Sequence, residues 1–174
     1  MKNELPALKF LYSKVNEFNN DWGYDLTVKI KFWNKYFAEY QGYHGGHGVI
    51  RLEAYKNRTE ILEDLYHELG HAVLDQYKVP RHMLNIFRDH NPNITRERSG
   101  KLTCDDEIPP PSGYVSWYSM VNGTEEFCEL LSAWACSGYK MQGYINYGDW
   151  RHSIDDEPKL KRKILAIKRI LSIG

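Results

Sequence analysis

Long apolar segments and an excess of charge of either sign are absent from this sequence of 174 residues. Lysine plus arginine and aspartate plus glutamate balance at 23 each, so no global field favours nucleic acid or an anionic membrane. The first ten residues, MKNELPALKF, hold no apolar signal core, and no apolar run approaches the length of a membrane span. We therefore expect a cytoplasmic protein with neither a nucleic-acid nor a membrane partner.

Cysteine is also scarce. Cys104, Cys128 and Cys136 are odd in number and form no CxxC pair. Reduced thiols in a cytosolic compartment explain this usage, and we expect Cys128 and Cys136 to share one buried helix. A disulfide that uses Cys104 is the alternative.

The length and composition are those of one globular unit. A chain of this length matches the size of one domain and is long enough to bury a core. Apolar residues make up 42% and charged residues 26%, which are ordinary values for a globular protein. The sequence shows no internal repeat and no domain boundary, so we predict a single domain over residues 1–174.

Hydrophobic periodicity predicts one helix and three strands in the first third of the chain. Apolar residues recur at helical spacing over residues 5–18. Alternation predicts a strand over residues 26–32 with one solvated face and another over 49–55, and residues 36–40 predict a shorter strand between them. The last of these is either a sheet edge that offers unpaired backbone groups to an extended peptide or an ordinary internal strand.

Two polar segments carry no predicted regular structure. His44 and His47 lie in a glycine-rich turn over residues 42–48, and such flexible surroundings disfavour a second metal site there. Residues 91–111 are polar and proline-rich and predict a surface excursion. We expect its acidic run, residues 105–107, to be solvated rather than to bind calcium.

The segment NRTEILEDLYHELGHAVLDQY, residues 57–77, predicts a largely buried helix. Asn57 can act as its N-cap, and Glu60, three positions later, completes a capping box. Apolar residues follow at helical spacing: Ile61, Leu62, Leu65, Leu69, Ala72 and Val73.

This predicted helix carries an HExxH motif at residues 67–71. Because positions i and i+4 share one face of a helix, His67 and His71 can present two imidazoles to one zinc ion. Glu68 projects from nearly the same face, where a carboxylate can reach a metal-bound water. The alternative is a buried helix whose two histidines are satisfied by hydrogen bonds.

A catalytic zinc usually takes three protein ligands and keeps one position open, so a third ligand is needed. The extended motif HExxHxxGxxH is excluded, because Leu74 stands at the glycine position and Tyr77 at the last histidine. The remaining candidates are His82, His90, His152 and the acidic residues at 125–129.

Residues 125–137, EEFCELLSAWACS, predict a second buried helix with a cap at Asn122. It offers Glu125 and Glu129 at i, i+4, so that one can bind metal while the other orients an imidazole. Burying two carboxylates on an apolar helix is costly unless a cation pairs with them. The alternative is a solvated acidic first turn, which suits Glu125 and Glu126 but suits Glu129 less well.

In these two segments the sequence resembles the gluzincin metallopeptidases, and more closely the catalytic domain of the anthrax lethal factor type and related small peptidases. These proteins follow HExxH with a tyrosine, an asparagine and an E-x-F-x-E helix. The corresponding positions here are Tyr118, Asn122, Glu125, Phe127 and Glu129. The resemblance covers residues 57–77 and 116–134, and Cys128 stands where the family often has alanine.

The resemblance implies a zinc site and assigns roles to its residues. It implies His67, His71 and Glu125 as zinc ligands and Glu68 as general base. It also implies Glu129 as the partner of a ligand histidine and Tyr118 as a hydrogen-bond donor near the metal. A tyrosine that simply packs at the start of a helix is the alternative for Tyr118.

The remaining segments predict a helical scaffold. Pro80 can open a short helix, the stretch after Gly138 predicts irregular structure, and residues 155–158 open a last helix. The basic residues of that last helix predict a solvated face rather than a polyanion site; they are Lys159, Lys161, Arg162, Lys163, Lys168 and Arg169.

We therefore expect an α+β, zincin-like fold in which a small, mainly antiparallel sheet packs against the HExxH helix and a second metal-ligand helix. The expected function is a zinc-dependent peptidase that acts on peptide or protein substrates. The alternatives are a catalytically silent zinc-bound interaction module, and an intracellular regulatory peptidase that resembles the phage-antirepressor-cleaving type.

Overall fold

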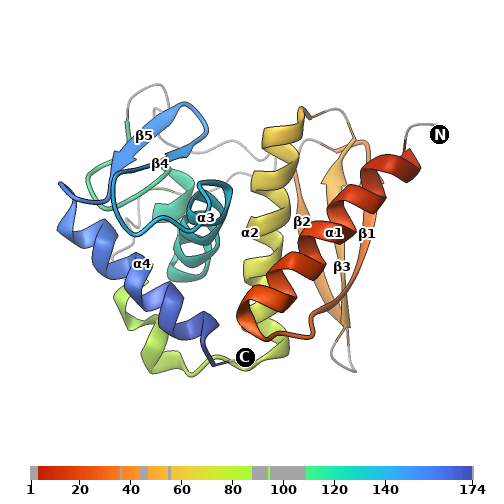
Figure 1. The fold of residues 1–174 in the computed structure, drawn as a ribbon, viewed down its shortest axis with the longest axis horizontal. Helices are drawn as coiled ribbons and strands as arrows, with labels where there is room; N and C mark the ends of the chain where they lie inside the picture. Colours follow the sequence, from red (N-terminus) through yellow and green to blue (C-terminus); the bar gives the residue numbers. More distant parts are fainter. Residues whose placement is uncertain are drawn as a thin grey trace.

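A computed structural model describes residues 4–35, 37–43, 47–54, 56–87, 94 and 109–173 of this chain. The fold is α+β, as predicted (Figure 1). Its elements are α1 (Glu4–Trp22), β1 (Thr27–Trp33), β2 (Glu39–Tyr43), β3 (His47–Glu53), α2 (Arg58–Gln76), the 3-10 helices η1 (Arg81–Phe87) and η2 (Tyr118–Met120), α3 (Gly123–Cys136), β4 (Tyr144–Tyr147), β5 (Trp150–Ser153) and α4 (Pro158–Leu171).

The larger sheet has three strands in the order β1-β3-β2 and is mixed. β1 pairs with β3 in parallel, and β2 pairs with β3 in antiparallel fashion. The expected mainly antiparallel sheet is thus found only in part. The chain forms the two edge strands β1 and β2 first, and β3 then inserts between them, parallel to β1 and antiparallel to β2. β3 is internal, because it is paired with a strand on each edge, and its successive residues Gly48, Val49 and Ile50 are buried. The edge strand beside α2 is β2.

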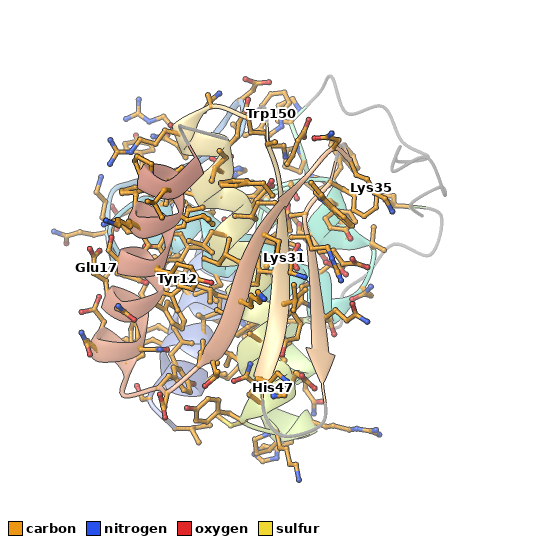
Figure 2. All side chains as sticks on the ribbon, turned by 90° about the vertical axis from the view of Figure 1, so that its right-hand side faces the viewer. Tyr12, Glu17, Lys31, Lys35, His47 and Trp150 are labelled. Carbon is orange, nitrogen blue, oxygen red and sulfur yellow. The ribbon has the colours of Figure 1, made fainter. Side chains whose placement is uncertain are left out.

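Strand β1 has the solvated face that its alternation predicts. Ile30 is buried while Lys29 and Lys31 are exposed, and Figure 2 shows Lys31 on the outer face of the sheet. Helix α1 lies against this strand, where the Tyr12 hydroxyl accepts the backbone N–H of Ile30 at 2.9 Å.

Helix α2 lies between the sheet and α3 (Figure 1). The two helices approach closely at Gly70, where an added Cβ would lie 2.9 Å from Cys128 Sγ and 3.1 Å from its Cα. The Ser132 hydroxyl also donates to the Glu63 carbonyl at 2.6 Å. Cys128 and Cys136 are free thiols on the same helix, α3, as predicted, and Cys128 is fully buried.

Two predictions for the C-terminal third are wrong. The stretch after Gly138 is not irregular throughout, because β4 and β5 form an antiparallel hairpin that packs on α3. Ile145 provides its buried contact. In α4, Lys163 does not belong to a solvated basic face, because it is only 3% exposed.

Lys163 is enclosed by partners from three directions. It forms an ion pair with the buried Glu126 of α3 and donates to the Gly113 carbonyl at 3.0 Å. Its ammonium group also lies 3.9 Å from the centroid of the Tyr114 ring. A buried lysine needs such compensation for its charge.

No helix among the described residues is long and apolar enough to cross a membrane. The predictions for Cys104, His44 and the acidic run at 105–107 lie outside the described residues.

Candidate metal centre

Side-chain caps fix the start of both helices that meet at the HExxH motif. Asn57 accepts the backbone N–H groups of Thr59 and Glu60, and the Glu60 carboxylate accepts the N–H of Asn57 at 3.1 Å, so the predicted capping box is present. On α3, Asn122 accepts the N–H of Thr124 at 2.9 Å and that of Glu125 at 3.0 Å. The second cap therefore holds the turn from which Glu125 projects.

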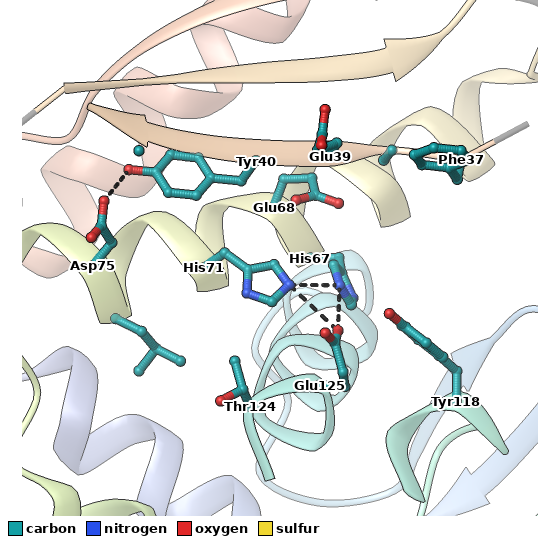
Figure 3. Close-up of a pocket in the computed structure, with 13 residues that line it drawn as sticks. Phe37, Glu39, Tyr40, His67, Glu68, His71, Asp75, Tyr118, Thr124 and Glu125 are labelled. Atoms are coloured by element: carbon teal, nitrogen blue, oxygen red, sulfur yellow. Dashed lines mark hydrogen bonds and ion pairs between the residues drawn. The ribbon is translucent and has the colours of Figure 1, made fainter. Parts of the chain in front are cut away.

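Three side-chain atoms from α2 and α3 form a nearly equilateral triangle (Figure 3). His67 Nε2 lies 3.2 Å from His71 Nε2 and 3.2 Å from Glu125 Oε2, and His71 Nε2 lies 3.4 Å from the same oxygen. Ligands bound tetrahedrally to zinc at its usual bond lengths stand about 3.3 Å apart. The triangle therefore has the dimensions of one face of a zinc coordination sphere.

The charges around this triangle also suit a cation. Glu125 Oε2 is buried and lies 3.2 Å from His67 Nε2 and 3.4 Å from His71 Nε2. His67 Nδ1 lies 2.7 Å from Glu129 Oε1. A neutral imidazole carries one proton, and Glu129 favours that proton on Nδ1, which leaves a lone pair on Nε2. Two lone pairs and a carboxylate oxygen then face one point, an arrangement that a metal ion would stabilise.

The pKa of His67 is raised and that of Glu125 is lowered, as expected for a site that stabilises positive charge. Burial lowers the pKa of His67, but hydrogen bonding to Glu125 and Glu129 outweighs it and raises the pKa to about 10. Burial raises the pKa of Glu125, but the two imidazoles hold it well below its usual range. Without a metal, the site would therefore take up a proton instead.

Cys128 is a competing third ligand. Its Sγ and one ring nitrogen of each histidine all lie within 4.8 Å of one another. Burial raises the pKa of this thiol well above its ordinary value, and the carboxylate of Glu125 adds to the effect. A metal needs the thiolate, whereas Glu125 is already ionised and its Oε2 lies 3.2 and 3.4 Å from the two imidazoles. We therefore favour Glu125 as the third ligand.

The two predicted catalytic residues line the same cavity of about 900 Å³ (Figure 3). Glu68 is 4% exposed, and its burial raises the pKa of the carboxyl although His67 and His71 lower it. The Tyr118 ring stacks on His67, with centroids 5.9 Å apart and an angle of 29° between the planes. Its hydroxyl points toward the cavity.

Edge strand β2 forms the opposite wall of this cavity. Two lining residues, Tyr40 of β2 and Asp75 of α2, were not predicted from the sequence. The Tyr40 hydroxyl donates to Asp75 Oδ2 at 2.8 Å, and Gly42 leaves room for that carboxylate. Asp75 stands four residues after His71 on the same helical face, so the spacing could have identified it. Tyr40 carries no comparable signal.

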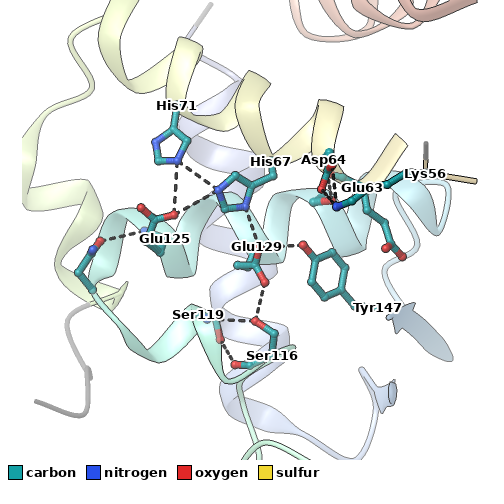
Figure 4. A network of polar contacts seen from close by, with 12 residues as sticks. Lys56, Glu63, Asp64, His67, His71, Ser116, Ser119, Glu125, Glu129 and Tyr147 are labelled. Atoms are coloured by element: carbon teal, nitrogen blue, oxygen red, sulfur yellow. Dashed lines mark hydrogen bonds and ion pairs between the residues drawn. The ribbon is translucent and has the colours of Figure 1, made fainter. Parts of the chain in front are cut away.

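Behind the triangle, Glu129 lies in a polar network that also contains Ser116 and Tyr147 (Figure 4). The Ser116 hydroxyl donates to Oε2 at 2.5 Å and the Tyr147 hydroxyl to Oε1 at 2.8 Å. Neither residue stands at a motif position, although Ser116 lies in a segment that the resemblance covers, so the sequence did not predict their roles.

Other candidate ligands have different surroundings. The ring of His152 is buried, with Nε2 3.1 Å from the Val115 carbonyl and Nδ1 3.8 Å from Glu157. His82 lies on η1 and is absent from the lining of the described cavity. Glu126 faces Lys163, so Glu125 is the glutamate of that pair that faces the imidazoles. His90 lies outside the described residues.

Comparisons with protein-family models, with curated proteins and with solved structures found no match to this chain. The likeness to gluzincins therefore rests on the two motif segments and on the site that they form.

Proposed function

We propose that this chain is a zinc-dependent peptidase of the gluzincin type with His67, His71 and Glu125 as zinc ligands. The observation that carries the proposal is the set of mutual distances of 3.2–3.4 Å among the three donor atoms at the wall of an open cavity. Glu129 would orient His67 by accepting the proton on Nδ1.

Bound to these donors, Zn²⁺ would supply Lewis acidity toward a peptide carbonyl and toward water. Glu68 lines the cavity, and burial raises the pKa of its carboxyl, which makes the carboxylate a stronger base. It would take a proton from the attacking water and deliver it to the leaving amine. The Tyr118 hydroxyl would donate a hydrogen bond to the carbonyl oxygen as negative charge develops there.

The position of β2 supports a peptide substrate. Among the described residues this strand pairs with β3 alone, and Glu39, Tyr40 and Gly42 line the cavity. A free strand edge can pair with an extended peptide through backbone hydrogen bonds, which would lay the peptide across the imidazoles. A sheet edge that runs above an HExxH helix also agrees with the zincin-like fold that we propose.

Metal content of protein purified without chelator tests the ligand set. We expect one zinc per chain in the wild type, and loss of zinc in His71→Ala and in Glu125→Ala. His82→Ala is the matched control and should retain zinc, because this histidine lies on η1 outside the triangle. A wild type that neither contains nor takes up zinc would overturn the proposal.

Cleavage of a mixed peptide library tests the chemistry. Glu68→Gln should retain zinc while its rate falls by roughly 10²- to 10⁴-fold, the usual contribution of a general base. If the wild type binds zinc and cleaves no peptide, the interaction module becomes the better description.

A further inference from the structure

We propose that Ser116 and Tyr147 are positioning residues, which fix the carboxylate of Glu129 and, through it, the ring of His67. The β4–β5 hairpin and the segment before η2 would then set the affinity of the metal centre. This inference rests on the proposed function and assigns a role to parts of the chain that no motif covers.

The contacts of Glu129 leave its carboxylate little freedom. Oε1 lies 2.7 Å from His67 Nδ1 and accepts the Tyr147 hydroxyl at 2.8 Å, while Oε2 accepts the Ser116 hydroxyl at 2.5 Å. Glu129 itself is only 6% exposed, so water competes weakly for these oxygens. With a donor on each oxygen, rotation of the carboxylate would break at least one short hydrogen bond.

The hydroxyl of Ser116 is itself directed. Its oxygen accepts the backbone N–H of Ser119 at 3.0 Å, and the Ser119 hydroxyl donates to the Ser116 carbonyl at 2.6 Å. A hydroxyl has one proton to donate. Because the Ser119 N–H can only donate to the Ser116 oxygen, the proton of the Ser116 hydroxyl remains for Glu129. The turn into η2 thus aims Ser116 at the carboxylate.

Tyr147 is aimed by the hairpin. Its strand packs on α3 through the fully buried Ile145, and the N–H of Gly148 donates to Glu63 of α2 at 3.4 Å. Burial raises the pKa of the Tyr147 phenol well above its ordinary value, and the charge of Glu129 adds to this, so the hydroxyl remains a donor.

These contacts bear on the metal because Glu129 selects the tautomer of His67. With the proton held on Nδ1, Nε2 is free to bind a cation. Loss of such an outer partner costs roughly 10- to 100-fold in metal affinity, and we expect each hydroxyl to account for about 3- to 10-fold of it.

Competition with a chromophoric chelator measures the zinc Kd of each variant. Tyr147→Phe and Ser116→Ala should raise the Kd by about 3- to 10-fold. Tyr144→Phe is the control for the first, because this tyrosine lies on the same strand, is 46% exposed and packs under Arg151. Ser112→Ala is the control for the second, since this exposed hydroxyl contacts Glu157 instead.

A double-mutant cycle separates positioning from general stability. On a Glu129→Gln background, Tyr147→Phe should have less effect on the zinc Kd, because the hydroxyl acts through the carboxylate. Ser116→Thr, which keeps a hydroxyl, should restore the wild-type Kd. The melting temperature of the zinc-free protein reports any purely structural loss.

An unchanged Kd in both Tyr147→Phe and Ser116→Ala, with zinc bound normally by the wild type, would overturn this inference alone. A lower melting temperature without a change in Kd would do the same, because it indicates a structural role. Wild-type protein that binds no zinc would overturn the proposed function and this inference with it.

Discussion

Helix α3 buries acidic side chains in two places, and the partners differ. On one side Glu126, 2% exposed, forms an ion pair with Lys163 of α4. On the other, Glu125 and Glu129 meet the rings of His67 and His71, which can be neutral. Glu129 is nearly as buried as Glu126, at 6% exposed, so the partner rather than the burial distinguishes a completed ion pair from a site with room for a metal.

The two sites also differ in how their polar atoms are used. The Lys163 ammonium contacts a carboxylate, a carbonyl and an aromatic face, all from the chain itself. Around His67, the groups that can donate an electron pair to a metal are the imidazole nitrogens and one buried carboxylate oxygen. A buried acid whose partner is a lysine is therefore weaker evidence for a metal site than a buried acid whose partners are imidazoles.

The largest effect should come from breaking the completed ion pair. Lys163→Met removes the ammonium group that pairs with the buried Glu126, and breaking a buried ion pair by removing one partner destabilises a protein by about 3–5 kcal/mol. The double variant Lys163→Met/Glu126→Leu should recover much of this loss. Urea unfolding measures both values, and the zinc Kd should stay unchanged wherever the protein is folded.

Lys161→Met is the matched control on the same helix. Its side chain is 47% exposed and lies 3.9 Å from Asp155, so we expect a change within about 0.5 kcal/mol. If Lys163→Met were equally mild, Lys163 would not hold the buried position described above.

The next largest effect should be a pH dependence of the stability of the zinc-free protein, which arises at the histidine site. In zinc-free protein the folded pKa of His67 is about 10, above its ordinary value of 6.5. Protonation therefore stabilises the fold fully below about pH 6.5, and this contribution is lost as the pH rises toward 10. The shift is worth of the order of a few kcal/mol.

Thermal unfolding of chelator-treated protein between pH 6.5 and 10 checks this prediction. The raised pKa of Glu68 acts in the same direction, because folding favours its neutral form. Zinc should flatten the profile, and His67→Gln should flatten it without zinc. A stability that rises with pH across this window would contradict the charge balance inferred for the site.

A smaller effect should follow from separating the two helices. In Gly70→Ala the new methyl group meets Cys128, and such overpacking costs about 1–3 kcal/mol, partly offset by the better helix propensity of alanine. Because the contact lies between the helices of His67 and Glu125, the zinc Kd should also rise.

Adding Cys128→Ala to Gly70→Ala should restore part of the stability, since it removes the Sγ contact and leaves the 3.1 Å contact to Cα. Urea unfolding and chelator competition report the two effects. Unchanged zinc binding in Gly70→Ala would indicate that the site tolerates movement of α3.

The smallest effect should come from the caps. Asn57→Ala and Asn122→Ala should each cost about 1 kcal/mol in unfolding free energy. Only Asn122→Ala should weaken zinc binding, because it loosens the turn that carries Glu125, whereas Asn57 lies about 15 Å along its helix from His67. Equal effects on the zinc Kd would contradict this reasoning.

The sequence predicted the two site helices because each combines local signals. The cap at Asn57, the HExxH spacing and the cap at Asn122 depend on residues within one or two helical turns of each other. The pairing of Glu125 with the imidazoles is a contact between distant segments, and it was predicted from the i, i+4 spacing to Glu129 together with the family resemblance.

Features set by tertiary contacts were harder to predict. The β4–β5 hairpin has strands of only four residues, and it depends on the burial of Ile145 against α3. Lys163 did carry a signal, because it shares the helical stripe of Leu160, Ile164 and Ile167, but six basic residues in one helix obscured it.

The hydroxyl of Tyr12 has a consequence for how foreign chains can approach the molecule. By accepting the Ile30 N–H, it occupies a backbone donor on the outer margin of β1. A strand from another chain would have to displace α1 to pair with β1, whereas the edge strand β2 lines the same cavity as the imidazoles. The asymmetry discourages edge-to-edge pairing of sheets between molecules at β1 and leaves β2 as the edge that an extended chain could reach, which the proposed peptidase function requires.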